Sequence, residues 1–104
     1  MKKFLALALA LVMLLPFAAC SQQGSGDIVI GGLSPLTGAA SFYGNGVTNG
    51  AKIAVDEINA AGGVLGRQIK FVNYDEQADP TEAINAYNKL VQTDKIIALM
   101  GDVT

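Results

Sequence analysis

The side chains that could carry out acid–base or metal chemistry are few and lie close together. Asp75, Glu76 and Asp79 form an acidic cluster, and carboxylates can bind divalent cations or exchange protons with a substrate. The chain has no histidine and a single cysteine, Cys20, which excludes histidine catalysis, His/Cys zinc sites and intrachain disulfides. We interpret Asp79 as a helix cap and Asp75 and Glu76 as solvated loop acids. No catalytic residue, metal site or cofactor is predicted.

Three glycines offer a weak resemblance to a dinucleotide-binding loop. Gly44, Gly46 and Gly50 differ in spacing from the Gly-x-Gly-x-x-Gly fingerprint. They also begin about ten residues beyond the preceding predicted strand, whereas the fingerprint follows its strand directly. We therefore predict that these glycines allow close packing at the start of a helix and bind no nucleotide.

The first 19 residues have the three parts of a secretory signal. Lys2 and Lys3 give a positive start, residues 4–15 are an unbroken apolar run, and two alanines precede Cys20. The run is shorter than the roughly 20 apolar residues that span a bilayer. Residues 17–20 resemble a bacterial lipobox, although Phe17 stands where a Leu-like residue is usual. This resemblance implies that Cys20 becomes the N-terminus and carries a diacylglycerol; secretion with an incidental Cys20 is the alternative.

The chain that follows this signal is acidic. Without residues 1–19 it has five Lys/Arg against nine Asp/Glu, a net charge of −4. Scattered basic residues in an acidic chain give no support for nucleic-acid binding or for a polybasic membrane contact. Residues 21–26, polar and glycine-rich, predict a flexible tether after Cys20. The 85 residues from Cys20 onward are short for a domain, which typically has about 100–150.

The elements that must position any site alternate between strands and helices. Apolar, β-branched runs predict strands at residues 28–33, 68–74 and 96–100, the third apolar on both faces as in the middle of a parallel sheet. Helical spacing predicts one helix from Val47 to the glycines at 62–63. A second helix starts at Asp79-Pro80-Thr81-Glu82, which supplies a cap, a proline and a carboxylate in order, and ends near Thr93. The predicted apolar faces are Val47, Ala51, Ala54, Ile58 and Ala61 in the first helix and Ala83, Tyr87, Leu90 and Val91 in the second.

This alternation predicts an open parallel α/β sheet with strand order 2-1-3 and helices on both faces. In such a sheet a ligand binds beyond the carboxyl ends of the strands, at the switch point between strands 1 and 3. Two segments meet there, the predicted loop at residues 34–44 and residues 101–104. Both are rich in small and hydroxyl residues and in backbone N–H groups, which suits a carboxylate.

Several short motifs then follow one another in a distinctive order. They are Gly32-Leu33-Ser34-Pro35-Leu36-Thr37-Gly38, Tyr43-Gly44, Asn49-Gly50-Ala51, Glu57-Ile58-Asn59-Ala60-Ala61-Gly62-Gly63, Asp79-Pro80 and Ala86-Tyr87-Asn88-Lys89-Leu90-Val91. Residues 27–104 as a whole resemble the branched-chain amino-acid-binding (Leu/Ile/Val-type) family of solute-binding proteins of ABC transporters.

The resemblance implies an extracytoplasmic, often lipid-anchored protein with two α/β lobes that close on a ligand by hinge bending. Residues 27–104 are then the first βαβαβ unit of lobe 1, and the chain is an N-terminal fragment. Tyr43 is implied to line the pocket and to pack on the ligand's side chain. Thr104 is implied to begin the hydroxyl run that binds the ligand carboxylate. Asp102, where relatives have proline or an uncharged residue, is interpreted as a turn or cap residue.

We accordingly predict the substrate-binding component of an ABC importer of amino acids, with branched-chain amino acids as the first class, and not an enzyme. The predicted partners are the amino acid, the membrane permease and the membrane itself through the lipid on Cys20. A sensor or receptor domain of the same fold is an alternative, as is a binder of another amino acid or of a small amide such as urea. An enzyme on a flavodoxin-like sheet is disfavoured by the export signal and by the absence of a phosphate loop.

Overall fold

The computed structural model describes residues 26–104. The predicted signal segment, Cys20 and all but the last residue of the predicted tether lie outside the described residues. The elements are β1 (Ile28–Ser34), α2 (Ser41–Ala60), β2 (Ile69–Asp75), α3 (Pro80–Gln92) and β3 (Ala98–Met100).

The three strands form one parallel sheet with β1 in the middle. β1 pairs with β2 along its full length, from Ile28 opposite Ile69 to Ser34 opposite Asp75. It pairs with β3 over three residues, from Ile30 opposite Ala98. The order β2-β1-β3 confirms the predicted α/β fold with strand order 2-1-3.

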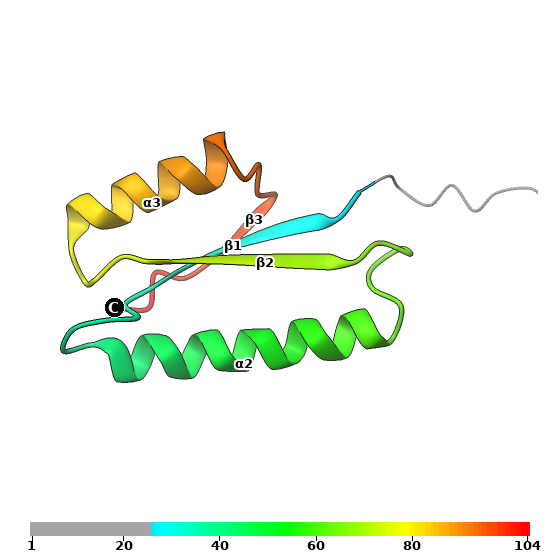
Figure 1. Ribbon diagram of the computed structural model, residues 1–104, viewed down its shortest axis with the longest axis horizontal. Coiled ribbons are helices and arrows are strands. Elements are labelled where there is room, and N and C mark those ends of the chain that lie inside the picture. The colour runs from blue at the N-terminus through cyan, green and yellow to red at the C-terminus, as the bar shows by residue number, and fades with distance from the viewer. Residues whose placement is uncertain (1–25) are drawn as a thin grey trace, which may run out of the picture.

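The helices cover opposite faces of this sheet, α2 on one side and α3 on the other (Figure 1). All three strands end at the same edge. The loop into α2, the loop into α3 and the C-terminal end of the chain therefore lie close to one another there (Figure 1). This carboxyl edge is where a parallel α/β sheet normally binds its ligand.

Helix α3 begins as its sequence predicts. The Asp79 side chain accepts hydrogen bonds from the N–H groups of Thr81 (2.8 Å) and Glu82 (3.0 Å), and Pro80 opens the helix. Leu90 is fully buried. Tyr87 and Val91, which were predicted on the apolar face, are exposed in the described part of the chain.

Helix α2 begins at Ser41, six residues before the predicted start, so Tyr43 and Gly44 belong to its first turn and not to a loop. No local signal marks this start, because Ala40 at the N-cap has no side chain to cap the helix and the first turn has no acidic residue. Gly44, Gly46 and Gly50 lower the helical propensity further. The glycine-rich end at residues 62–63 was predicted correctly.

The predicted apolar face of α2 is wrong except for Ala51. The least exposed positions of the helix form a different stripe, which includes Thr48 and Asn59. Both polar side chains are satisfied: Asn73 donates to the Thr48 hydroxyl (3.1 Å), and Asn59 exchanges two hydrogen bonds with the backbone of Ile69 (2.8 and 2.7 Å). Because these hydrogen bonds allow Thr48 and Asn59 to lie on the covered side of the helix, the spacing of apolar residues predicted the wrong face.

The third strand is shorter than predicted and starts at Ala98. Ile97 still donates its N–H to the carbonyl oxygen of Val29 (2.9 Å), so the residue before β3 also bonds to β1. Within residues 26–104 its only neighbour is β1, and Leu99 is exposed. In that same range, no helix is both long enough and apolar enough to cross a membrane.

Candidate functional site

The carboxyl edge of the sheet is organised around the loop at residues 35–40, between β1 and α2. Asp75, the last residue of β2, accepts hydrogen bonds from the N–H groups of Leu36 (2.8 Å) and Thr37 (3.4 Å) and from the Thr37 hydroxyl (2.6 Å). It also accepts the N–H of Gln77 (3.0 Å). One carboxylate therefore joins the loop after β1 to the loop after β2.

These contacts set the protonation of Asp75. Burial acts to raise the pKa of Asp75, but the hydrogen bonds from the Thr37 hydroxyl and from the N–H groups of Leu36, Gln77 and Thr37 outweigh it and hold the pKa below its usual range. The interpretation of Asp75 as a solvated loop acid was wrong, because both of its oxygens are engaged.

The same loop is tied to α2 from the other side. Asn45 donates to the carbonyl oxygens of Leu36 (3.0 Å) and Ser41 (2.8 Å). Gly44 is buried against Pro35, with no room for a Cβ atom between them. The first turn of α2 is thus positioned by tertiary contacts and not by a cap of its own.

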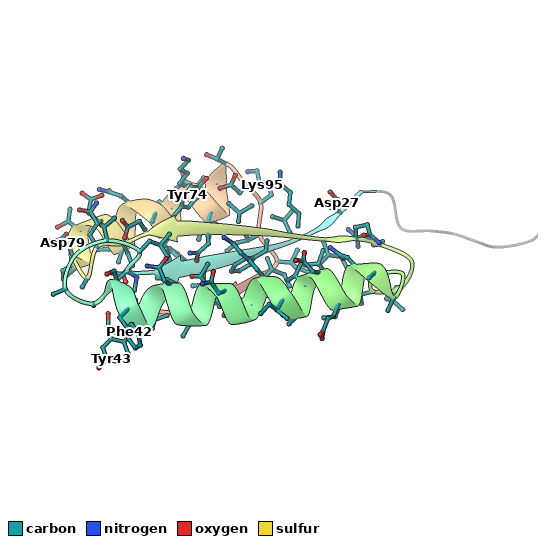
Figure 2. All side chains as sticks on the ribbon, turned by 60° about the horizontal axis from the view of Figure 1, so that its bottom comes forward. Asp27, Phe42, Tyr43, Tyr74, Asp79 and Lys95 are labelled. Carbon is teal, nitrogen blue, oxygen red and sulfur yellow. The ribbon has the colours of Figure 1, made fainter. Side chains whose placement is uncertain are left out.

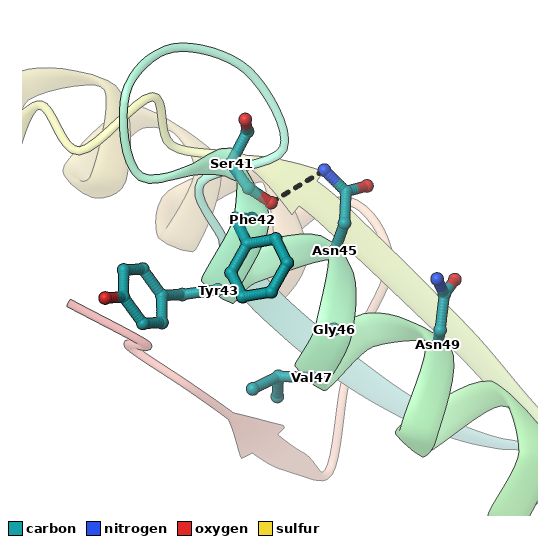
Figure 3. Close-up of a pocket in the computed structure, with 7 residues that line it drawn as sticks. All are labelled: Ser41, Phe42, Tyr43, Asn45, Gly46, Val47 and Asn49. Carbon is teal, nitrogen blue, oxygen red and sulfur yellow. Dashed lines mark hydrogen bonds between the residues drawn. The ribbon is translucent and has the colours of Figure 1, made fainter.

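Two aromatic side chains project from that first turn. Phe42 and Tyr43 pack edge to face, with ring centroids 5.8 Å apart and an interplanar angle of 81°. They are 84% and 64% exposed and point away from the sheet at the end of the molecule where Asp79 lies (Figure 2). They border an open hollow of about 660 Å³, whose other lining residues are Ser41, Asn45, Gly46, Val47 and Asn49 (Figure 3).

Thr104 lines a second, smaller cavity of about 150 Å³ on the same edge. Its walls include Glu76, Asp79 and Asp102. Tyr43 does not line this cavity, and Thr104 does not line the aromatic hollow. The structure therefore places both predicted ligand contacts on the carboxyl edge but in separate cavities.

Glu76 was predicted to be a solvated acid, and this was wrong, because it is only 2% exposed. Its Oε2 accepts the N–H of Ala78 (2.7 Å), whereas Oε1 has no hydrogen-bond partner among residues 26–104. Burial raises the pKa of Glu76; the Ala78 bond opposes this, and the charges of Asp102 and Asp75 add to it. Asp102, which we interpreted as a turn or cap residue, lines the same cavity as Glu76 and disfavours a negative charge on the Glu76 carboxyl group.

The aromatic pair and the acidic cavity differ in what they can bind. An exposed pair of rings packed edge to face offers contact to an apolar group, whereas the cavity beside Thr104 combines a hydroxyl with carboxyl groups. Across residues 26–104, no group of three or more His, Cys, Asp or Glu side chains is arranged to hold a metal ion. The sequence did not predict that Asp75 and Asn45 hold the loop at residues 35–40. The only local signals for these roles are an acid at the end of a strand and an amide near the start of a helix.

Comparisons with known proteins identify the family to which the chain belongs. A family model described as periplasmic binding protein matches residues 27–104. An amino acid binding protein from Pseudomonas aeruginosa is 42% identical over 100 residues, which are 96% of this chain and 25% of that protein. The Leu/Ile/Val-binding protein BraC3 from Rhizobium johnstonii is 42% identical over 98 residues, 94% of this chain and 26% of that protein.

A solved structure shows the same relationship in three dimensions. It is the branched-chain amino acid transporter substrate binding protein LivJ from Streptococcus pneumoniae in complex with isoleucine. The TM-score is 0.70 and the identity 40%, over 72% of this chain and 22% of that chain. The chain thus spans about a quarter of the length of the proteins that it matches.

Proposed function

Because the chain belongs to the periplasmic binding protein family, we propose that it acts in the extracytoplasmic substrate-binding component of an ABC importer and captures amino acids, branched-chain ones first. Residues 27–104 form the first βαβαβ unit of lobe 1 in this proposal. The observation that carries it is the exposed Phe42–Tyr43 pair, which borders a hollow at the carboxyl edge of a 2-1-3 sheet.

The chemistry of the edge supports a ligand with an apolar side chain. The Tyr43 ring is available to pack against an aliphatic group, and the Thr104 hydroxyl can donate to a carboxylate. The acidic side chains of Glu76 and Asp102 disfavour binding of a ligand carboxylate close to Thr104. The proposed contact between Thr104 and the carboxylate therefore needs further N–H or hydroxyl donors near the Thr104 hydroxyl. The permease and a lipid anchor at Cys20 complete the proposed set of partners.

Calorimetric titration tests this function, carried out on the complete two-lobed protein of which residues 27–104 are proposed to be the first part. The ligands are leucine, isoleucine and valine, with lysine and urea for comparison. Tyr43→Ala is expected to weaken binding of the preferred amino acid by about tenfold, the equivalent of about 1.4 kcal/mol. Tyr87→Ala is the matched control, since Tyr87 is also an exposed tyrosine but belongs to α3. Equal affinities of the wild-type, Tyr43→Ala and Tyr87→Ala proteins would show that Tyr43 is no ligand contact. If the complete two-lobed protein binds none of these compounds, the proposed function is refuted.

The proposed anchor is tested separately by the intact mass of the protein extracted from membranes of the cell that produces it. A diacylglyceryl increment on a chain that begins at Cys20 is expected. A mass without this increment would remove the anchor and leave the binding function untouched.

A further inference from the structure

We propose that Asp75 is a positioning residue for the Tyr43 site: its carboxylate holds the loop at residues 35–40 and thereby fixes how α2 presents Phe42 and Tyr43 to the ligand. This inference rests on the proposed function and names a residue on which that function depends. Asp75 itself need not touch the ligand.

The first step runs from β2 to the loop. Asp75 stands on a paired strand, opposite Ser34 at the end of β1, so its backbone is fixed on the sheet. Both carboxylate oxygens are used, Oδ1 by N–H groups and Oδ2 by the Thr37 hydroxyl at 2.6 Å. Hydrogen bonds to an ionised carboxylate are short and stronger than neutral ones, so Asp75 holds the loop at two successive residues.

The second step runs from the loop to the helix. The backbone of Leu36 is held on both sides, because its N–H donates to Asp75 and its carbonyl oxygen accepts from Asn45. Asn45 lies two residues after Tyr43 in the same helix. Since α2 has no side-chain cap of its own, this chain of contacts sets the orientation of its first turn, together with the packing of Gly44 on Pro35.

The hydrogen bonds between Asp75 and the loop lie at an exposed part of the molecule. Their loss should therefore affect the position of α2 more than the stability of the whole fold. Thr37 is exposed and Asp75 only half-buried, so losing their bond leaves no fully buried polar group without a partner. We therefore expect a local change at the start of α2 and only a small change in global stability.

Fluorine NMR of the full chain labelled with 3-fluorotyrosine reports on Tyr43 directly, with its signal assigned by Tyr43→Phe. Asp75→Asn removes the Oδ2 acceptor, and Thr37→Val removes the hydroxyl that Oδ2 accepts. Both are expected to shift or broaden the Tyr43 signal and to weaken leucine binding by roughly three- to tenfold. Thr37→Ser keeps the hydroxyl and is expected to restore both properties.

Asp94→Asn is the matched control, because Asp94 also accepts a hydrogen bond, from the Tyr74 hydroxyl (2.9 Å), but follows α3 at the other end of the sheet. It is expected to move the Tyr74 signal and to leave the Tyr43 signal and leucine affinity unchanged.

The outcomes distinguish this inference from the proposed function. If the complete two-lobed wild-type protein binds none of leucine, isoleucine and valine, the proposed function fails, while the Tyr43 signal still decides whether Asp75 positions the first turn. An unchanged Tyr43 signal in both Asp75→Asn and Thr37→Val would overturn the inference. So would a changed signal with unchanged leucine affinity, because the position of Tyr43 would then not matter for binding. Should Asp75→Asn fail to fold, the Tyr43 signal and leucine affinity of Thr37→Val decide the matter.

Discussion

Replacing Gly44 by alanine is expected to destabilise the protein, although alanine forms helices better than glycine. A Cβ atom at this position would overlap the carbonyl oxygen of Pro35 and lie 2.7 Å from its carbonyl carbon. These are backbone atoms, and the hydrogen bonds of Leu36 with Asp75 and Asn45 oppose their movement. Overpacking costs about 1–3 kcal/mol, and an overlap with backbone atoms belongs in the upper part of this range, about 2–3 kcal/mol. The opposing gain in helical propensity is about 1 kcal/mol. The free energy of unfolding should therefore fall by roughly 1–2 kcal/mol.

Gly50→Ala is the matched control in the same helix. A Cβ atom there meets nothing within 4 Å, so only the propensity term applies, and the free energy of unfolding should rise by about 0.5–1 kcal/mol. Urea denaturation of both variants in the full chain measures the two changes. We expect Gly44→Ala to lower the free energy of unfolding and Gly50→Ala to raise it. If Gly44→Ala is as stable as wild type, or if both variants change in the same direction, the close approach of α2 to Pro35 does not constrain the fold.

Two further predictions concern a buried carboxyl group, that of Glu76, and a half-buried amide, that of Asn59. Because burial raises the pKa of Glu76, its contribution to stability is greatest below its unfolded pKa and is lost as the pH rises through the folded pKa. Glu76→Gln should therefore increase the free energy of unfolding at pH 7 by about 1 kcal/mol, with a smaller gain at pH 5; a loss at pH 7 would contradict the raised pKa. Asn59→Ala removes both hydrogen bonds to the Ile69 backbone and should cost about 1–3 kcal/mol in urea denaturation, whereas Asn88→Ala, at an exposed position of α3, should stay within about 0.5 kcal/mol. Equal effects of the two asparagine variants would show that the Ile69 contact contributes nothing.

The parts of the fold that local signals specify were predictable. The residues from Asp79 to Glu82 carry a complete helix start, and α3 begins where they place it. The strand–helix alternation and the 2-1-3 order follow from apolar runs and from the handedness of parallel crossovers. The start of α2 was not predictable in this way, because its first turn is held by Asp75, Asn45 and Pro35, and none of these contacts is visible along the chain.

The candidate site was likewise predictable only in part. Tyr43 and Thr104 were identified through family resemblance, since an exposed tyrosine and a terminal threonine carry no chemical signal of their own. Their placement on one edge follows from the sheet order. Their separation into two cavities depends on side-chain packing, which spacing along the chain does not determine.

Asp75 and Glu76 show most clearly why sequence alone could not assign the site. They are adjacent acids of similar chemistry, yet the pKa of Asp75 is lowered and that of Glu76 is raised. Successive side chains point to opposite sides where an extended chain leaves a strand. Asp75 reaches the loop that leads to Tyr43, whereas Glu76 is buried beside the cavity that Thr104 lines. Because the end of β2 contacts both places, a change there should alter both proposed ligand contacts, while a change in the aromatic hollow should alter only one.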